Sequence, residues 1–574
     1  MISKPTKRFN TVGVCKPADH YMIPPLPRLP DVNNLIDDKF YFVLHAPRQS
    51  GKTTCLEALT EKINSEGQHY AVNCSLDSLR NIEDDLKAMD MVTNEINAGL
   101  GESRVPEIRE LAFSFDGSPY RTQPNLKVRY LLRSLCRSLD RELIVFFDEA
   151  DCLHENPLVM FLVQIRAGYL KRSDSPETMF PRSLALVGMR DIRDYLYRIR
   201  PEERSTGLGS PFNVREESLT LADFTFEEIG ALYWQHTEET GQIFEPGAVE
   251  RVWFWTEGQP WLVNALADDV IYKRFKKDYS RAITGADIDQ SARNLILRNP
   301  PHFDSLLERL KEPRVRRVIE PVITGAGILP GNVPTDDAEY TIDLGLLKGN
   351  PDDNVSFRAS NPIYGEVIVR ALTRKLQKDV PPQLANRWMD GTRLDMDGLL
   401  RAFQLYWRTN ANINEKSIGK SVEEETQDNE RIDRLLSIPD LADKYKVKQE
   451  IVEIISKNRR GFSTEDIPHN VLNAFLQRVL NGGADFIQRE CALGRTRADI
   501  CVSYKGIYYP LELKIKGAEA LNDSLKQLSG YMDKCGATVG WLIVFDLYFK
   551  KLWRDKQFWD TQSLNGHTIH VVGC

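Results

Sequence analysis

The chain has 574 residues, of which 42% are hydrophobic and 27% are charged, and its net charge is −7 at pH 7. This length exceeds what a single hydrophobic core supports, so we expect three or four globular domains. An acidic chain lacks a general basic surface, and any contact with nucleic acid therefore requires a local patch.

The sequence contains no signal for export or membrane insertion. The basic start, Met1 to Arg8, is not followed by an apolar segment, and no stretch approaches about eighteen apolar residues. The nine Cys are scattered singly, without the spacing of zinc ligands. We therefore expect a cytoplasmic protein with reduced thiols and no membrane partner.

The first predicted unit is a strand, a phosphate-binding loop and a helix. An apolar run at 41–44 precedes the loop, and a helical pattern follows it. In such a loop backbone N–H groups surround a β-phosphate, Lys52 reaches the β and γ oxygens, and Thr53 offers its hydroxyl to Mg²⁺ at a helix start. Ala46 replaces the usual first glycine, which is acceptable at negative φ. We expect ATP and Mg²⁺ to bind at Ala46, Pro47, Arg48, Gln49, Ser50, Gly51, Lys52, Thr53 and Thr54.

A second apolar run, at 143–147, leads directly into Asp148 and Glu149. This pattern predicts a buried parallel strand that ends in acids. We expect Asp148 to hold Mg²⁺ through water and Glu149 to polarise the attacking water, which implies hydrolysis of the nucleotide. The alternative is a core strand followed by a helix N-cap, for which Asp is a favoured residue.

Residues 1–222 are predicted to form a doubly wound parallel sheet, because five apolar runs alternate with helical stretches, at 41–44, 70–76, 143–147, 183–188 and 217–221. Arg190 follows the fourth run, where a γ-phosphate sensor would lie. The arginine-rich loop after it contains Arg193, Arg198, Arg200 and Arg204. In ring-forming ATPases an Arg from this region reaches the neighbouring subunit's nucleotide. We therefore expect a homo-oligomer; the alternative is a solvated charged loop.

Residues 223–298 are predicted to form a helical lid with a turn at Gly258, Gln259 and Pro260. This turn resembles that of the signal-transduction and origin-recognition branches of the AAA+ class, where it packs near the nucleotide base. Taken alone, a Gly and a Pro at a helix start are only turn chemistry.

Residues 299–376 show helices around 303–323, the run 340–347, a polar turn, a strand at 355–358 and a helix that opens at 361. This order predicts a winged-helix domain, which binds DNA or another protein. Arg314, Arg316 and Arg317 lie on a preceding helix rather than on the expected recognition helix. Residues 377–433 form a connecting region, whose part from 410 to 433 has the composition of a linker.

Residues 434–574 are predicted to contain a helix, three strands, a second helix and a fourth strand. In the strand at 507–515, Glu512 and Lys514 share one face. Asp499, on the paired strand, can converge with Glu512 on Mg²⁺ or Mn²⁺, which polarises a phosphodiester, while Lys514 orients water or stabilises charge. The alternative is a solvent-exposed strand face.

This spacing and the αβββαβ order are similar to the PD-(D/E)XK nuclease superfamily. The resemblance implies that Gln527 lies near the metal, whereas Ala498 in place of Pro, and Pro510 inside the metal strand, depart from the pattern.

The whole chain resembles a group of prokaryotic proteins that join an AAA-like ATPase to such a nuclease. Residues 20–25 and 475–483 carry this resemblance as well. It implies an ATP-regulated DNA nuclease, with defence against foreign DNA as an analogy. The alternative is a nucleotide-switched ATPase that binds nucleic acid or protein and has an inactive nuclease-like domain.

Overall fold

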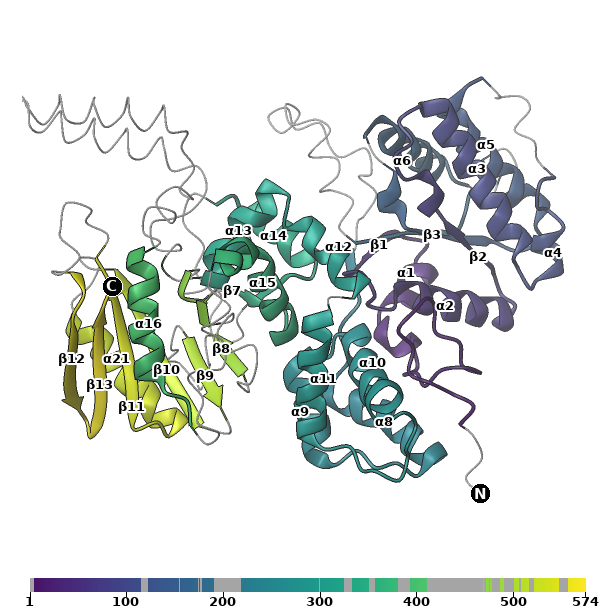
Figure 1. Ribbon diagram of the computed structural model, residues 1–574. Coiled ribbons are helices and arrows are strands. Elements are labelled where there is room, and N and C mark those ends of the chain that lie inside the picture. The colour runs from purple at the N-terminus through teal and green to yellow at the C-terminus, as the bar shows by residue number, and fades with distance from the viewer. Residues whose placement is uncertain are drawn as a thin grey trace, which may run out of the picture. The chain divides into compact units, whose positions relative to one another are not determined.

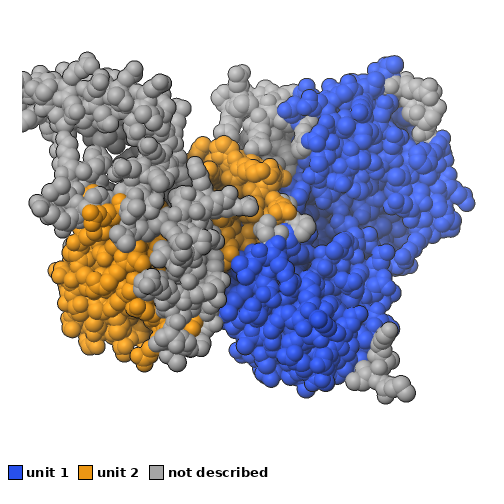
Figure 2. All heavy atoms as spheres, in the orientation of Figure 1, with its two compact units in different colours: residues 1–301, 338–347, 360–363 blue, residues 302–337, 348–359, 364–574 orange. Residues whose placement is uncertain are grey.

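The computed structural model describes the chain in two compact units. One unit comprises residues 1–301, 338–347 and 360–363, and the other comprises residues 302–337, 348–359 and 364–574 (Figure 2). Outside the described residues lie 1–4, 115–121, 154, 174, 176–177, 190–217, 299, 325–332, 350–356, 380–392, 410–467, 469–470, 474, 477–485, 490–499, 505–506, 516–520 and 547–555.

The first unit is built on a five-stranded parallel sheet with the order β2-β3-β4-β1-β5 (Figure 1). Its strands are β1 (Tyr41–His45), β2 (Tyr70–Ser75), β3 (Leu143–Asp148), β4 (Ser183–Gly188) and β5 (Ser218–Thr220). These are the five apolar runs of the sequence, with ends that coincide or differ by one residue. The prediction of a doubly wound parallel α/β sheet is confirmed.

Helices cover both faces of this sheet (Figure 1), which explains why β1, β3 and β4 are buried along almost their whole length. Val145 faces one hydrophobic cluster and Phe146 faces the other, because successive strand residues point to opposite sides. Helices α3, α5 and α6 supply the first cluster, and α1 and α2 supply the second. The bounds are α1 (Val32–Asp37), α2 (Lys52–Glu66), α3 (Asp85–Gly101), α4 (Pro106–Arg109), α5 (Pro124–Ser138) and α6 (Glu155–Leu170).

The segment that follows the sheet is helical; its assignment as a lid stays a prediction, and we call it the lid below. It contains α8 (Phe226–Thr240), α9 (Pro246–Thr256), α10 (Pro260–Asp268), the π-helix η6 (Asp269–Arg274) and α11 (Gly285–Arg298). A capping box between Thr225 and Glu228 starts α8. The N-terminal arm, residues 8–23, completes the lid core: the ring of Phe9 lies 5.0 Å from that of Tyr21 and 5.3 Å from that of Tyr233.

The next elements are α12 (Pro301–Arg309), α13 (Pro313–Thr324), α14 (Thr335–Asp343), the short paired strands β6 (Leu347–Gly349) and β7 (Phe357–Ala359), and α15 (Pro362–Asp379). The run at 340–347 therefore begins as the end of a helix, and only its last residue is strand. The winged-helix assignment stays a prediction.

A six-stranded mixed sheet with the order β12-β13-β11-β10-β9-β8 forms the C-terminal module. Its elements are β8 (Phe486–Arg489), β9 (Ile500–Tyr504), β10 (Ile507–Ile515), α21 (Leu521–Cys535), β11 (Val539–Phe545), β12 (Trp559–Leu564) and β13 (His567–Gly573). Strands β10, β11 and β13 run parallel, whereas β9 and β12 are antiparallel to their neighbours.

Helix α16 (Met396–Thr409) belongs to this module, although the sequence placed residues 377–433 in a connecting region. Its buried Leu399 and Phe403 share a hydrophobic cluster with Leu511 of β10 and Phe545 of β11. The C-terminal core thus extends back to Leu394. Among the described residues, no helix is long and apolar enough to cross a membrane.

Candidate nucleotide site and a second polar cluster

The loop between β1 and α2 has the shape of an anion-binding nest. Gln49 and Gly51 have φ values of 59° and 95°, which turn successive peptide N–H groups toward the inside of the loop. The value at Gly51 is one that side-chain-bearing residues rarely adopt. Ala46 is buried without a positive φ, and its N–H donates to the carbonyl of Gly188 at 3.2 Å. The substitution of the usual first glycine is therefore accommodated, as expected.

Lys52 lies inside this loop and is only 7% exposed. Its Nζ donates to the carbonyls of Ala46 at 2.8 Å and Pro47 at 3.0 Å. Burial lowers the pKa of Lys52, and the charges of Glu149 and Asp148 oppose that shift. A phosphate oxygen is a stronger acceptor for an ammonium group than a neutral carbonyl, so bound phosphate would draw Lys52 away from these contacts.

Thr53 and Asp148 meet at the mouth of the loop. The Thr53 hydroxyl, at the start of α2, donates to Asp148 Oδ2 at 2.7 Å. Asp148 Oδ1 accepts the N–H of Glu149 at 2.9 Å. Hard oxygen ligands of this kind fit Mg²⁺, which Thr53 would bind directly and Asp148 would hold through water. The two predicted metal-site residues are therefore adjacent, although they lie more than ninety positions apart in the sequence.

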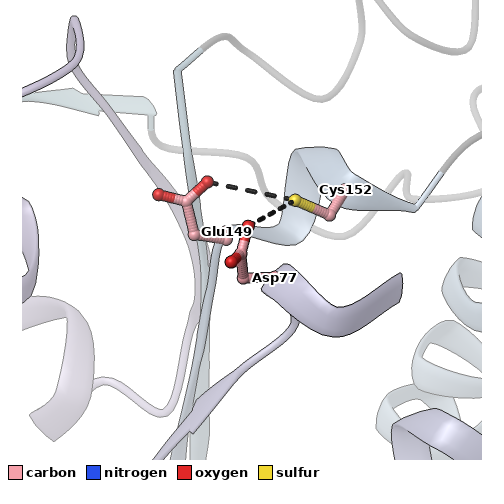
Figure 3. A group of neighbouring side chains, drawn as sticks. All are labelled: Asp77, Glu149 and Cys152. Atoms are coloured by element: carbon pink, nitrogen blue, oxygen red, sulfur yellow. Dashed lines mark hydrogen bonds between the residues drawn. The ribbon is translucent and has the colours of Figure 1, made fainter. Parts of the chain in front are cut away.

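Glu149 follows in a left-handed conformation, with a φ of 55°. Cys152 lies next to it and also next to Asp77, at 4.0 and 3.8 Å from their carboxylate oxygens (Figure 3). Arg80 donates to Asp77 at 2.8 Å and to Cys152 Sγ at 3.4 Å, and it lies 3.9 Å from Glu149 Oε2. The guanidinium of Arg80 therefore supplies the positive charge that this acidic group needs, and we regard the cluster as the surroundings of Glu149 rather than a separate metal site.

The pKa of Glu149 is raised, first by burial and then by the charges of Asp151 and Asp148, while Lys52 acts in the opposite direction. The carboxyl group consequently takes up a proton at a higher pH than an ordinary glutamate. Its predicted role as the group that polarises water requires the anionic form.

A pocket of about 620 Å³ opens beside the phosphate loop. The loop forms one side, lid residues form another, and the arm residues 10–15 close it. Trp261 Nε1 donates to the carbonyl of Thr11 at 2.9 Å, and Asn264 Oδ1 accepts the N–H of Asn10 at 3.3 Å. The arm was not predicted to line the site, because no local motif marks it and only the fold brings it to the loop.

The turn at Gly258, Gln259 and Pro260 lies beside this pocket. Pro260 is the first residue of α10 and lines the pocket, and Gln259 Nε2 lies 3.5 Å from the carbonyl of Gln49. The resemblance implied this neighbourhood for the turn.

Arg28 is a pocket residue that sequence reasoning missed. Its Nη2 donates to the carbonyl of Ser50 in the phosphate loop at 3.0 Å and to the carbonyl of Ala222. The guanidinium carbon lies 4.9 Å from the ring centre of Phe224. Burial lowers the pKa of Arg28. This side chain ties the loop to the start of the lid.

Arg190 and the four candidate finger residues, Arg193, Arg198, Arg200 and Arg204, lie outside the described residues. The γ-phosphate sensor and the arginine finger stay predictions.

In the other unit, Glu512 and Lys514 lie on one face of β10, as predicted. Lys514 Nζ is 3.6 Å from Glu512 Oε1, and Glu512 is fully buried. Leu511 and Leu513 point into the hydrophobic core on the opposite face. The alternative of a solvent-exposed strand face is therefore wrong for Glu512.

The approach of the other two members of the predicted nuclease constellation to this pair stays a prediction. Asp499 lies outside the described residues, next to Ile500, which pairs with Leu511 in the antiparallel ladder. Gln527 lies on the exposed side of α21. Buried Tyr531 of the same helix packs against Cys501 of β9.

The parallel sheet, the phosphate loop and the contact between Thr53 and Asp148 together define the first unit as a P-loop ATPase fold. No family model matches the sequence, and no curated protein matches it either.

Solved structures that are similar to the chain are remote. A Walker-type ATPase, PABY2304 of Pyrococcus abyssi, is 14% identical over 63% of this chain and 99% of its own, with a TM-score of 0.43. The Holliday junction branch migration motor RuvB of Thermotoga maritima is 14% identical over 57% of this chain and 89% of its own, with a TM-score of 0.29. The ORC1 protein of Aeropyrum pernix, solved in complex with DNA, is 13% identical over 62% of this chain and 93% of its own, with a TM-score of 0.31. At these scores the likeness carries no argument about function.

Proposed function

We propose that the protein binds and hydrolyses ATP. The contact of Thr53 with Asp148 carries this proposal, because it places a hydroxyl and a carboxylate where Mg²⁺ joins a nucleotide to a phosphate loop. When bound, Mg²⁺ neutralises phosphate charge. Lys52 then binds the β and γ oxygens, and the anionic form of Glu149 orients and polarises water.

Binding of a fluorescent ADP analogue and release of phosphate from ATP, each with Mg²⁺ or with EDTA, test this activity. We expect Mg²⁺-dependent binding and turnover. A purified, folded protein that binds neither ADP nor ATP would overturn the proposal.

We further propose that the C-terminal module is a metal-dependent DNA nuclease that the ATPase regulates. Two observations support it. The order of strands β8, β9 and β10, helix α21 and strand β11, after a helix that includes Val471 and Phe475, follows the αβββαβ pattern. The buried carboxylate of Glu512 also lies beside the Lys514 ammonium. Glu512 and Asp499 would hold Mg²⁺ or Mn²⁺, and the metal would polarise the phosphodiester.

Cleavage is tested by incubation with labelled plasmid, linear duplex, single-stranded DNA and RNA, in Mg²⁺ or Mn²⁺, with and without ATP. We expect metal-dependent cutting of DNA that changes when ATP is added. Cutting of RNA alone would correct the substrate class.

One observation favours a second candidate function, a nucleotide-switched binding protein whose nuclease-like module is inactive. Glu512 is fully buried with Lys514 as an ionic neighbour, so a metal ion would have to displace an existing interaction. Calorimetric titration with Mn²⁺ separates the two. Absence of both metal binding and cleavage would establish the second candidate.

The domain between lid and nuclease module is a poor candidate for the DNA contact. Arg314 and Arg317 of α13 lie 3.1 and 3.4 Å from Asp337 oxygens, which neutralises part of their charge. Helix α14 itself carries Asp336, Asp337 and Glu339. We therefore place the proposed DNA contact on the nuclease module.

We also propose a homo-oligomer as the active form.

A further inference from the structure

A turn from far along the chain lies against the phosphate loop within the first unit. Helix α14 ends at Asp343, and Gly345 follows with a φ of 73°. The N–H of Gly345 donates to the carbonyl of Ile342 at 2.7 Å, and the N–H of Leu346 donates to that of Thr341 at 3.3 Å. This pair of bonds is a Schellman cap, which requires a left-handed residue at Gly345 and fixes the shape of the turn.

The turn touches the loop at two points on either side of Ala46. The backbone of Gly345 approaches Pro47 so closely that an added Cβ would lie 2.5 Å from Pro47 Cγ and 2.6 Å from Pro47 Cβ. Asp343 Oδ1 lies 3.7 Å from Nε2 of His45, the last residue of β1. The same His45 nitrogen is 3.1 Å from the Thr220 hydroxyl on β5.

Pro47 connects this turn to the groups that receive phosphate. Its carbonyl accepts from Lys52 Nζ at 3.0 Å and from the Ser50 hydroxyl at 2.9 Å. Any shift of the proline ring therefore changes the position of the carbonyl that Lys52 uses. The turn itself contributes no residue to the lining of the pocket.

The turn is itself fixed by buried side chains and a backbone hydrogen bond, so it can limit the movement of the phosphate loop. Leu346 is 1% exposed, and its carbonyl accepts the N–H of Ser360 at 3.1 Å. Tyr340 and Thr341, in the last turns of α14, are fully buried. A well-packed glycine backbone against a proline ring leaves the loop little freedom on that side.

We propose that the turn Asp343–Gly345 is a positioning element of the phosphate loop, which sets the affinity of the site for nucleotide phosphates without touching the nucleotide. This inference rests on the proposed nucleotide binding. The turn holds Pro47 and His45, and the loop in turn holds Lys52 and Ser50 in the arrangement that receives phosphate.

The Gly345→Ala substitution tests the contact, with Gly349→Ala as the matched control. A methyl group at Gly345 meets the ring of Pro47 and requires a left-handed alanine, whereas one at Gly349 meets open space. We expect Gly345→Ala to weaken ADP binding about tenfold and to raise KM for ATP more than it lowers kcat, because a strain of one to two kcal/mol corresponds to about that factor. We expect Gly349→Ala to bind ADP as the wild type does.

A compensating substitution distinguishes positioning from a general loss of structure. Pro47→Gly removes the ring atoms that the new methyl group would meet. We expect the Gly345→Ala effect on ADP binding to shrink markedly in the Pro47→Gly background. An equal loss in both backgrounds would overturn the role of the contact.

If Gly345→Ala does not fold, Asp343→Asn tests the other contact without added volume. We expect it to weaken ADP binding two- to fivefold, or roughly the contribution of one polar contact. Wild-type binding of ADP by all these variants would overturn the inference, while failure of the wild type to bind ADP would instead overturn the proposed function.

Discussion

The two residues with proposed roles in nucleotide chemistry lie on different elements: Lys52 begins α2, and Glu149 follows the last residue of β3. Lys52→Ala should abolish nucleotide binding, because it removes the buried ammonium group that donates to the carbonyls of Ala46 and Pro47 inside the loop. Glu149→Gln should preserve ADP binding and lower turnover by about 10² to 10⁴, the usual contribution of a general base. Binding of labelled ADP and steady-state phosphate release measure the two effects.

The exposed Glu250 of α9 provides the control for the second variant, since Glu250→Gln should leave both measurements unchanged. Native turnover by Glu149→Gln would show that another group polarises the water.

The raised pKa of Glu149 gives the reaction a dependence on pH. Because the proposed active form is the anion and the pKa of Glu149 is raised, kcat should fall on acidification at a higher pH than an ordinary glutamate would cause. The pH profile of kcat, measured at saturating ATP, should show this acid limb in the wild type. A limb confined to the usual range of an exposed glutamate would contradict the shift.

Among single residues, the sequence predicted those whose roles follow from a local motif, and it missed those that only the fold brings together. Lys52 and Thr53 belong to one contiguous loop, and Asp148 ends a strand whose apolar run is visible in the sequence. Arg28, Arg80 and Trp261 carry no spacing that marks them. They contact the site through long-range packing, which a residue pattern does not encode.

The stability of the lid should depend on pH through a buried histidine. His236 of α8 is fully buried, lies 3.0 Å from Gln242 Oε1 and packs against the rings of Phe9 and Tyr21. Burial lowers its pKa below the ordinary value of 6.5. The unfolded chain therefore takes up a proton before the folded lid does, and stability falls as the pH drops through about 6.5 toward the lowered pKa.

Thermal melts between pH 8 and pH 5 measure this effect. We expect the melting temperature of the wild type to fall over the acid part of that range, and we expect His236→Gln to start lower and to lose part of this slope. A wild-type melting temperature that rises on acidification would contradict the assignment.

Strands β1, β3 and β4 of the first sheet were predictable because they are buried on both faces and read as largely apolar runs. Strand β12 was not predicted, since its central residues are exposed and polar. Helix α16 has a strong apolar stripe, but in the sequence it precedes a linker-like segment. The composition of the whole region from 377 to 433 therefore indicated a connecting region instead of a helix.

For the whole molecule, two compact units separate the two proposed activities. Glu512→Ala should eliminate metal-dependent cleavage, because loss of a metal carboxylate weakens both metal affinity and its polarising action. ATP hydrolysis should remain close to that of the wild type. Parallel assays on the same preparation measure both activities, with the exposed Asp523→Ala variant of α21 as control. Undiminished cutting would place the nuclease site elsewhere.

The proposed homo-oligomer gives a prediction about concentration. If an arginine of a neighbouring subunit completes each nucleotide site, ATP turnover per chain should rise with protein concentration as subunits associate. Turnover measured from nanomolar to micromolar protein, with sedimentation at the same concentrations, tests this. A strictly monomeric protein with full specific activity would contradict it.

The N-terminal arm has a mechanical consequence for the first unit. Arm residues are built into the lid core, and the chain then continues into α1 and β1, while a second connection leads from β5 through Leu221 and Phe224 to α8. The lid is thus attached to the sheet by two covalent tethers. A body held at two points turns about the line that joins those points. We therefore predict that the lid rotates about a single hinge axis when nucleotide is exchanged in the pocket between lid and sheet.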